Sequence, residues 1–432
     1  MAGSIGFRFG LGTLLAALLV LGARPAGADP VRAFQFALQN GLQVVVVPDH
    51  RAPVVTQLVV YKAGAVDDPP GLSGLAHLVE ELMVRAVRPL PDSDGFAAHD
   101  DTMFRETVSK DKLRLAMHLE ATRMAGLDLT DGAVLAAREA ALDERRSRID
   151  NDPDALLREQ GEAALDLSHP YGRPVLGWPD EIRHIGLTEA DDFDKRHDAP
   201  NNAVLIVVGD TTPDEVRADA EAEFATVPSR ELAVRAEYGQ PPRLGATRID
   251  IVRKGPARFL RLYRTQSYAE AAPGQAEALE VLARLLGGGP ASLLQHRLVT
   301  QLRLASVVAV TYEGFKRDAG TFAIAVTPRP GVTLEALERG LDEAIAQIQN
   351  RAPGKADLAR AKAQLVAGGA FRHDGTADIA LAYGKALAIG LTAYDVQQWP
   401  SRIGAVGTDD VRKAAAGLLA RESVTATLTP SP

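Results

Sequence analysis

The sequence predicts an α+β protein with two homologous α/β sandwich domains, each a mainly antiparallel sheet covered by helices. Three observations lead to this prediction. A chain of 432 residues is too long for a single core, so two domains of roughly 200 residues are expected. The order strand, strand, helix, strand and paired helices occurs in both halves, which suggests an internal duplication. Residues 230–245 contain glycine and prolines with little periodicity, as expected of a linker between residues 29–229 and 246–432.

The first 28 residues have the pattern of a secretory signal peptide. Arg8 gives a positive start, residues 11–21 form a short apolar run, and Ala26-Gly27-Ala28 is a small-residue cleavage site. The apolar run is too short for a membrane span. We therefore expect a mature chain that begins near Asp29, is periplasmic or secreted, and contains no membrane span.

Charge and composition exclude several classes of partner and of active site. The formal net charge of −8 becomes −10 without residues 1–28, which hold Arg8 and Arg24 and no acid. An acidic balance argues against nucleic acid as a partner. The chain has no cysteine, which excludes disulfides, thiolate catalysis and cysteine-bound zinc. Any metal site must therefore use histidine and carboxylate side chains.

In the first half, the turn signal Asn40-Gly41 introduces a β-rich run, and valine-rich stretches alternate with amphipathic ones. The patterns predict strands at 42–48, 54–60, 96–108 and 203–209, and helices at 110–125, 132–149 and 212–225. The run at 203–209 is apolar throughout, as in a strand buried on both faces.

The second half repeats this order of elements. The predicted strands are 248–253, 259–265, 304–311, 321–327 and 424–428, and the predicted helices are 274–286, 334–349 and 355–371. The glycine-rich stretch 287–290 lacks the Gly-Lys-Ser/Thr ending of a phosphate loop, so a helix-ending turn is expected there.

Residues 73–86 contain candidate functional residues of the first half. The stretch has an apolar helical stripe formed by Leu75, Leu78, Val79 and Leu82. His77, Glu80 and Glu81 follow at i, i+3 and i+4, so they share one helix face and could offer ligands to a zinc ion. In the inverted zinc-peptidase motif H-x-x-E-H, two histidines bind the metal and the glutamate is the general base. Here the second histidine is a glutamate, and the alternative is an ordinary solvated helix face.

The chain resembles the pitrilysin/insulinase family of zinc metallopeptidases, the inverzincins, which includes the mitochondrial processing peptidase. The resemblance extends over nearly the whole mature chain. It is carried by residues 73–80 (Ser-Gly-Leu-Ala-His-Leu-Val-Glu), 100–108, 144–153, 200–210 (Pro-Asn-Asn-Ala-Val-Leu-Ile-Val-Val-Gly-Asp) and 286–294. Because these matches occur in the family's order, the resemblance implies the family's two-domain fold.

The resemblance also implies roles for individual residues. His77 corresponds to the first zinc ligand, Glu80 to the general base and Glu144 to the carboxylate ligand, while Glu81 stands at the second ligand position. A glutamate can bind zinc, but a second anionic ligand should acidify bound water less and favour harder cations. The expected cofactor is zinc on a degenerate H-x-x-E-E motif, or no metal at all.

Other positions depart from the family pattern. Ala137 stands where the family often has a glutamate, and the chain is shorter between Ala86 and Asp94. The family's substrate-holding Arg and Tyr correspond to Val299 and Ser306. Both halves of the expected active site are therefore altered.

Two hypotheses follow. The first is a weakly active or non-catalytic subunit of a peptidase assembly, a pseudoenzyme that binds peptides or unfolded polypeptides and pairs as a homo- or hetero-dimer with another family member. The second is an active zinc metalloendopeptidase with a His/Glu/Glu site and Glu80 as general base. Whether the chain is an enzyme stays open at this point.

Peptide capture is expected at the strand that contains Phe96, Ala97, Ala98 and His99, through addition of an extended peptide to the sheet edge. The alternative is a covered edge strand, with His99 as an ordinary surface histidine. The arginines at 145, 146 and 148 are expected to form a solvated face with local ion pairs.

Overall fold

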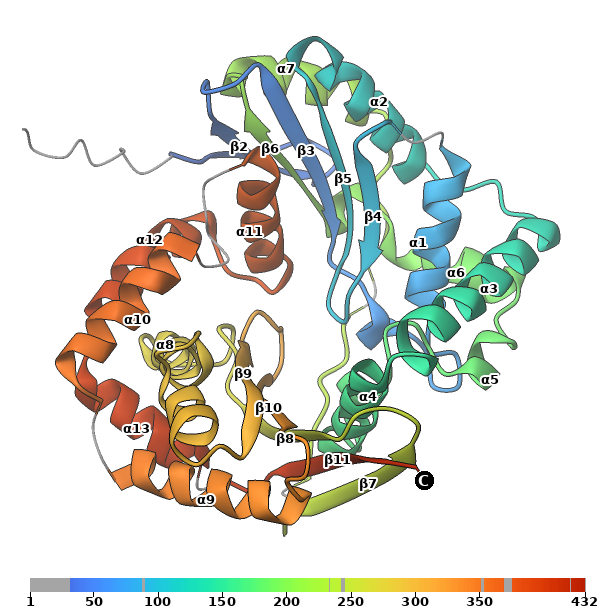
Figure 1. The fold of residues 1–432 in the computed structure, drawn as a ribbon. Helices are drawn as coiled ribbons and strands as arrows, with labels where there is room; N and C mark the ends of the chain where they lie inside the picture. Colours follow the sequence, from blue (N-terminus) through green and yellow to red (C-terminus); the bar gives the residue numbers. More distant parts are fainter. Residues whose placement is uncertain are drawn as a thin grey trace, which may run out of the picture.

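The computed structural model describes residues 32–87, 90–232, 234–241, 245–350, 353–368, 375–419 and 421–431. The predicted signal peptide and part of the predicted linker lie outside these ranges. Two sheets, each covered by helices, make up the described part of the chain (Figure 1). The predicted α+β class is confirmed.

The first sheet has the strand order β1-β2-β6-β3-β5-β4, with β2 parallel to β6 and the other neighbours antiparallel. Its strands are β1 (Phe34–Ala37), β2 (Gln43–Pro48), β3 (Val54–Tyr61), β4 (Ser93–Ala97), β5 (Thr102–Ser109) and β6 (Ala203–Gly209). The valine-rich strands β2 and β6 are buried on both faces, as the apolar run at 203–209 predicts for β6.

The second sheet has the order β7-β11-β8-β10-β9, with β7 parallel to β11. Its strands are β7 (Thr247–Arg253), β8 (Arg258–Thr265), β9 (Ala305–Glu313), β10 (Gly320–Pro328) and β11 (Val424–Pro430). When β1 is set aside, the strands of each half, counted along the chain, follow the order 1-5-2-4-3 in both sheets. This shared topology supports the internal duplication that the element order suggests.

The helices of the first half are α1 (Leu75–Ala86), α2 (Leu113–Met124), α3 (Asp131–Arg145), α4 (Pro153–Leu165), α5 (Pro179–Ile182), α6 (Leu187–His197) and α7 (Pro213–Phe224). Those of the second half are α8 (Gln275–Gly287), α9 (Leu334–Asn350), α10 (Lys355–Gly368), α11 (Thr376–Ala388), α12 (Ala393–Ala405) and α13 (Thr408–Leu419). Two wider π-helical segments follow at Arg146–Asp150 and Gln295–Gln301.

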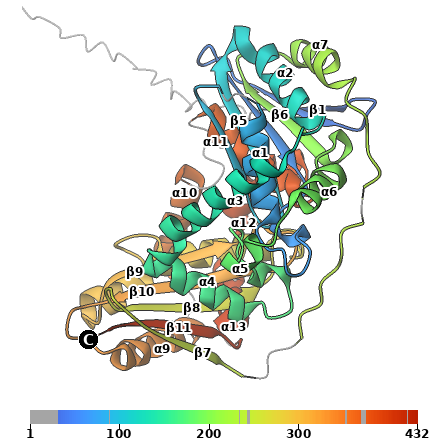
Figure 2. The same cartoon turned by 90° about the vertical axis from the view of Figure 1, so that its right-hand side faces the viewer.

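One helix of each half packs on the sheet of the other half. Helix α11 packs on β3 and β6 of the first sheet, and α4 packs on β8 and β11 of the second (Figures 1 and 2). Both helices have thirteen residues and a glycine at the ninth position, Gly161 in α4 and Gly384 in α11. A Cβ atom at these glycines would lie 2.9 Å from Leu262 and 2.7 Å from Leu58, which are equivalent leucines of β8 and β3. The absence of a side chain therefore brings each helix close to its sheet.

One predicted element needs correction. The single strand expected at 96–108 is a hairpin of β4 and β5, since the chain turns between Ala98 and Asp101. Helices α11, α12 and α13 were not predicted. The helix predicted at 355–371 is described only to Gly368.

A buried polar cluster joins the two halves close to the β4–β5 turn. The Tyr171 hydroxyl donates to the Asp100 carboxylate at 2.7 Å and accepts the Asp318 N–H at 3.1 Å. His169 Nε2 lies 3.1 Å from the Asp318 carboxylate. The hairpin tip is thus held against the loop between β9 and β10.

Among the described residues, no single helix is long and apolar enough to cross a membrane. Helices α11 and α12 reach the required length and hydropathy only as a pair, and the two are bent by 106°. The apolar side of α11 is buried on the first sheet, which accounts for its hydropathy.

Candidate functional site

Helix α1 carries three of the predicted site residues. Its apolar stripe of Leu75, Leu78, Val79 and Leu82 is buried as predicted. His77 and Glu80 are also buried, at 5% and 4% exposure. Since burying a charged group without a partner is costly, the two side chains need the neighbours described next.

Glu144 meets this face from the end of α3. His77 Nε2 lies 3.2 Å from a Glu144 carboxylate oxygen and 4.0 Å from Glu80. One possible ligand atom each from His77, Glu81 and Glu144 lies within 4.8 Å of the others. The three residues placed at the metal-ligand positions by the resemblance are therefore neighbours in the fold, although Glu144 follows the other two by 63 residues or more in the sequence.

Both candidate carboxylate ligands also contact an arginine one turn further along their helix. Glu81 pairs with Arg85 at 3.1 Å, and Glu144 pairs with Arg148 at 2.8 Å. Each arginine offsets part of the negative charge and restrains the orientation of its carboxylate. Arg85 and Arg148 are the outer contacts that sequence reasoning did not assign to the site, although their i+4 spacing is a signal for such pairs.

The electrostatics reflect burial and crowded carboxylates. Burial raises the pKa of Glu80 to about 7, with the charge of His77 opposing the shift and those of Glu81 and Glu144 adding to it. Burial lowers the pKa of His77, but the hydrogen bond to Glu144 and the surrounding carboxylates outweigh it and leave a net increase. The hydrogen bond from His77 lowers the pKa of Glu144.

The strand β4 lies directly against Glu80. A Cβ atom at Gly95 would come within 2.3 Å of Glu80 Oε1 and 2.7 Å of Val84. A side chain at position 95 would require Glu80 and Val84 to shift, so Gly95 allows the strand to approach the candidate general base closely. Sequence reasoning did not assign Gly95 this role, although a glycine inside a strand is a signal of close approach.

Strand β4 forms an edge of the first sheet, and its hydrogen bonds show which backbone groups are open. Thr107 N–H donates to Asp92 C=O, and Ala98 N–H donates to Asp101 C=O, so the even-numbered residues face β5. The backbone groups of the odd-numbered residues 93, 95 and 97 are therefore directed to the open edge.

This pattern limits the residues predicted to bind peptide. Phe96 and Ala97 lie in β4, but only Ala97 directs its N–H and C=O groups outward. The carbonyl groups of Ala98 and His99 accept the N–H groups of residues 65 and 66. His99 is not an isolated surface residue: its Nε2 lies 3.1 Å from a backbone carbonyl, and burial lowers its pKa to about 4.

Beneath α1, Arg123 forms a second polar cluster that the sequence did not reveal. Its Nε donates to the Met83 carbonyl at 3.0 Å, and its guanidinium pairs with Glu120 and lies 3.6 Å from Glu106. Its guanidinium also stacks on Phe104, 4.5 Å from the ring centre. These contacts tie α1, α2 and β5 together below the site.

The prediction that Arg145, next to Glu144, belongs to a solvated face needs correction. Its guanidinium is buried, donates to both Glu159 oxygens at 2.8 Å and donates to the Gly177 carbonyl. The predicted solvated face holds for Arg146 and Arg148, which are exposed, but was wrong for Arg145. The turn around Glu144 is therefore fixed to the protein interior through Arg145, while Arg146 and Arg148 face solvent.

The positions that depart from the family pattern lie apart from these ligands. Ala137 is fully buried in the core of the first half. Val299 lies in the π-helical segment before β9, and Ser306 lies in β9, where its hydroxyl donates to the Thr327 carbonyl.

The donor set fits a zinc ion in kind and spacing. Zinc ligands about 2.1 Å from a tetrahedral ion are roughly 3.4 Å apart, close to the separation between His77 and Glu144. One nitrogen and two carboxylates are ordinary zinc donors. One feature is unusual: His77 Nδ1 is buried with no hydrogen-bond partner among the described residues, whereas metal-bound histidines generally donate through their second nitrogen.

Comparison with known proteins bears on this arrangement. Residues 184–365 match the family model described as the Peptidase M16 inactive domain. The zinc protease PqqE of Helicobacter pylori is 28% identical over 343 residues, which cover 75% of this chain and 76% of that protein. These similarities support the resemblance of the chain to the pitrilysin/insulinase family, M16.

Solved M16-like structures share the fold. A protease from Helicobacter pylori superimposes with a TM-score of 0.85 at 24% identity, covering 92% of this chain and 99% of that one. The first half of the periplasmic protease PqqL from Escherichia coli gives a TM-score of 0.75 at 16% identity, covering 92% of both chains. The M16 model match begins after Glu144, so its "inactive domain" description does not refer to the candidate metal site.

Proposed function

We propose that this M16 protein binds extended peptides outside the cytoplasm, as a subunit of a peptidase assembly, and hydrolyses them slowly or not at all. The observation that carries the proposal is the glutamate at position 81. It gives the candidate metal site two carboxylates and one histidine, and Arg85 holds its carboxylate at 3.1 Å.

His77, Glu81 and Glu144 would hold the metal, and a bound zinc ion supplies an acidified water and polarises a peptide carbonyl. The second carboxylate places one more negative charge beside the ion than a second histidine would. Water at such an ion would therefore be less acidic than at an ion held by two histidines and one carboxylate. Glu80 is the residue positioned to accept a proton at its carboxylate, and Gly95 keeps the strand β4 close to it.

The open edge of β4 supports peptide binding. Residues 93, 95 and 97 direct backbone donors and acceptors away from the sheet, so an extended peptide can add as a further strand. A peptide on this edge would pass Gly95 and therefore run beside Glu80. The M16 departures at Val299 and Ser306 remove two side chains that would otherwise hold it.

The location and partner are part of the proposal. The signal-like residues 1–28 support export, and so does the similarity to a protein named as a periplasmic protease. A dimer with a second M16 chain would supply the substrate-holding groups that this chain lacks.

The test is binding of a labelled, unstructured peptide, followed by fluorescence anisotropy, with cleavage followed by mass spectrometry. Ala97→Pro removes an outward N–H from the β4 edge and should weaken binding by about tenfold or more. Ala37→Pro is the matched control, because Ala37 ends β1 at the opposite edge of the same sheet and is exposed. Equal binding by both variants would refute the peptide edge.

The alternative is an active zinc metalloendopeptidase. It is favoured by the spacing of His77, Glu81 and Glu144, whose ligand atoms lie within 4.8 Å, with Glu80 beside them. Rapid peptide cleavage that Glu80→Gln abolishes while zinc and peptide still bind would establish this alternative. Binding without cleavage supports the first proposal.

A further inference from the structure

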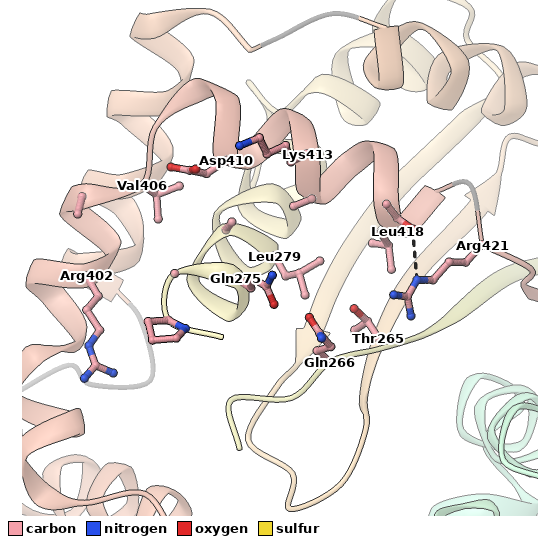
Figure 3. A pocket seen from close by; sticks show the side chains of 16 residues that line it. Thr265, Gln266, Gln275, Leu279, Arg402, Val406, Asp410, Lys413, Leu418 and Arg421 are labelled. Atoms are coloured by element: carbon pink, nitrogen blue, oxygen red, sulfur yellow. Dashed lines mark hydrogen bonds between the residues drawn. The ribbon is translucent and has the colours of Figure 1, made fainter. Parts of the chain in front are cut away.

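A cavity of about 530 Å³ lies in the second half of the molecule, far along the chain from the candidate metal site (Figure 3). It is bounded by the end of β8, the start of α8, the end of α12 and the helix α13. Its volume falls in the range of small-molecule sites. None of its lining residues belongs to the candidate metal site or to the β4 edge.

The cavity wall carries an excess of positive charge in an acidic protein. Arg402, Lys413 and Arg421 line it, with Asp410 as the acidic member. The Asp410 carboxylate accepts the backbone N–H of Gly407 at 2.9 Å, so part of its hydrogen-bonding capacity is used. Arg402 pairs with an aspartate of α12, whereas no carboxylate of the described residues pairs with Lys413 or Arg421. Two cations are therefore available to an anion.

Thr265 supplies a buried donor at the floor of the cavity. The residue is only 6% exposed, its hydroxyl points into the cavity, and no hydrogen-bond partner for it exists in the described part of the chain (Figure 3). The hydroxyl faces the cavity, so it can donate a hydrogen bond to a polar ligand group there.

Because the two halves share one topology, the N-terminal end of α8 beside the cavity can be compared with that of α1 in the first half. Both α1 and α8 follow a left-handed glycine, Gly74 with φ 90° and Gly274 with φ 88°. In the first half, the Asp68 carboxylate accepts the N–H groups of Gly74 and Ala76, both at 2.8 Å.

The second half has no such carboxylate from the preceding loop. The residue six positions before Gly274 is Tyr268, and its hydroxyl is engaged with Glu280. Glu277 accepts only the Gly274 N–H, at 3.1 Å. The start of α8, which favours negative charge, therefore opens into the cavity without the aspartate present in the first half.

Part of the remaining wall, which also includes Gln266 and Gln275, is apolar. Leu279, Val406 and Leu418 line the cavity between the polar floor and the cationic rim. Such a surface suits a hydrocarbon group attached to the anion.

We propose that this cavity binds a carboxylate group attached to an apolar body. The carboxylate would accept a hydrogen bond from Thr265 and pair with Arg421, which lies beside Thr265, while the charge of Lys413 attracts it from the other end of the cavity (Figure 3). The apolar part would lie on Leu279 and Leu418. Two ligand sources share this chemistry: the C-terminal end of a peptide with an apolar last residue, and a medium-chain organic acid. The site is independent of the proposed metal centre.

The test uses isothermal titration calorimetry on the whole mature chain with three probes: a hexapeptide ending in leucine, the same peptide with a C-terminal amide, and octanoate. Lys413→Glu and Arg421→Glu should each weaken carboxylate binding about tenfold or more. Arg412→Glu is the matched control, because Arg412 is exposed on the same helix and does not line the cavity. Thr265→Val should weaken binding and leave the Tm of the free protein nearly unchanged, which separates a ligand contact from a structural role.

The binding results with these probes and variants either support the proposed carboxylate site or overturn it. Binding of the acid peptide but not its amide, with the expected variant dependence, assigns the site to peptide ends. Binding of octanoate alone, with the same dependence, supports the proposal with an organic acid as ligand. Absence of binding by both probes, or binding unchanged in Lys413→Glu and Arg421→Glu, overturns it. His77→Ala should leave this binding unchanged, so failure of the metal site and failure of this site are distinguishable.

Discussion

Replacing Glu81 by histidine restores the H-x-x-E-H motif and tests why activity should be low. The structural cost is small. Glu81 and Arg85 form a partly exposed i,i+4 pair at 3.1 Å, with side-chain exposures of 27% and 49%. Such pairs contribute about 0.3–0.5 kcal/mol, and histidine has a slightly lower helix propensity than glutamate. The total loss should stay below about 1 kcal/mol, so the variant should remain folded.

The chemical gain should be larger. The substitution removes one negative charge from the ligand set, which makes metal-bound water more acidic. A decrease of one unit in the pKa of that water gives roughly tenfold more hydroxide near pH 7. We therefore expect Glu81→His, loaded with zinc, to cleave an unstructured peptide about tenfold faster or more than the native chain.

The assay is peptide cleavage followed by liquid chromatography, with zinc content measured on the same samples. Glu139→His on α3 is the matched control, since Glu139 is exposed and does not belong to the ligand set. Adding Glu80→Gln to Glu81→His should abolish the gain. A Glu81→His variant that binds zinc and cleaves no faster than the native chain would refute the reasoning from ligand charge.

Three further predictions concern the fold. Burial raises the pKa of Asp101 from 3.8 to about 7, so its contribution to stability is present below about pH 4 and is lost as the pH rises through about 7. Asp101→Asn should remove this loss, at most about 4 kcal/mol, in denaturant titrations at pH 4 and pH 8. Gly384→Val should cost about 1–3 kcal/mol more than Gly404→Val in thermal melts, because a Cβ at 384 would lie 2.7 Å from Leu58 and a Cβ at 404 meets no atom within 4 Å. Arg123→Leu leaves two buried glutamates without their cation and should cost about 3–5 kcal/mol in urea unfolding, and a cost below 1 kcal/mol would contradict the buried ion cluster.

Local periodicity was sufficient for many elements. The stripe that begins at Leu75 predicted the buried face of α1, because helix amphipathicity is a property of neighbouring residues. The apolar run at 203–209 predicted a doubly buried strand for the same reason. The proximity of Glu144 to His77 came from the resemblance, since nothing in local spacing links α3 to α1.

Other features depend on contacts between distant residues. The β4–β5 turn at Ala98–Asp101 contains no glycine or proline, so the hairpin was predicted as one strand. The exchange of α4 and α11 between the sheets cannot be read from either helix alone, although the glycine in each was a signal. The burial of Arg145 depends on Glu159, a residue of the next helix, and therefore looked like surface charge in the sequence.

The metal content of residues 29–432 tests the central claim most directly. Residues 29–432 would be dialysed against trace zinc, and bound metal per chain would be measured by elemental mass spectrometry, with His77→Ala as control. The proposed His77, Glu81 and Glu144 centre predicts close to one zinc per chain in the native protein and a loss of that zinc in the variant. Zinc at the same background level in both proteins would contradict a metal centre at this site.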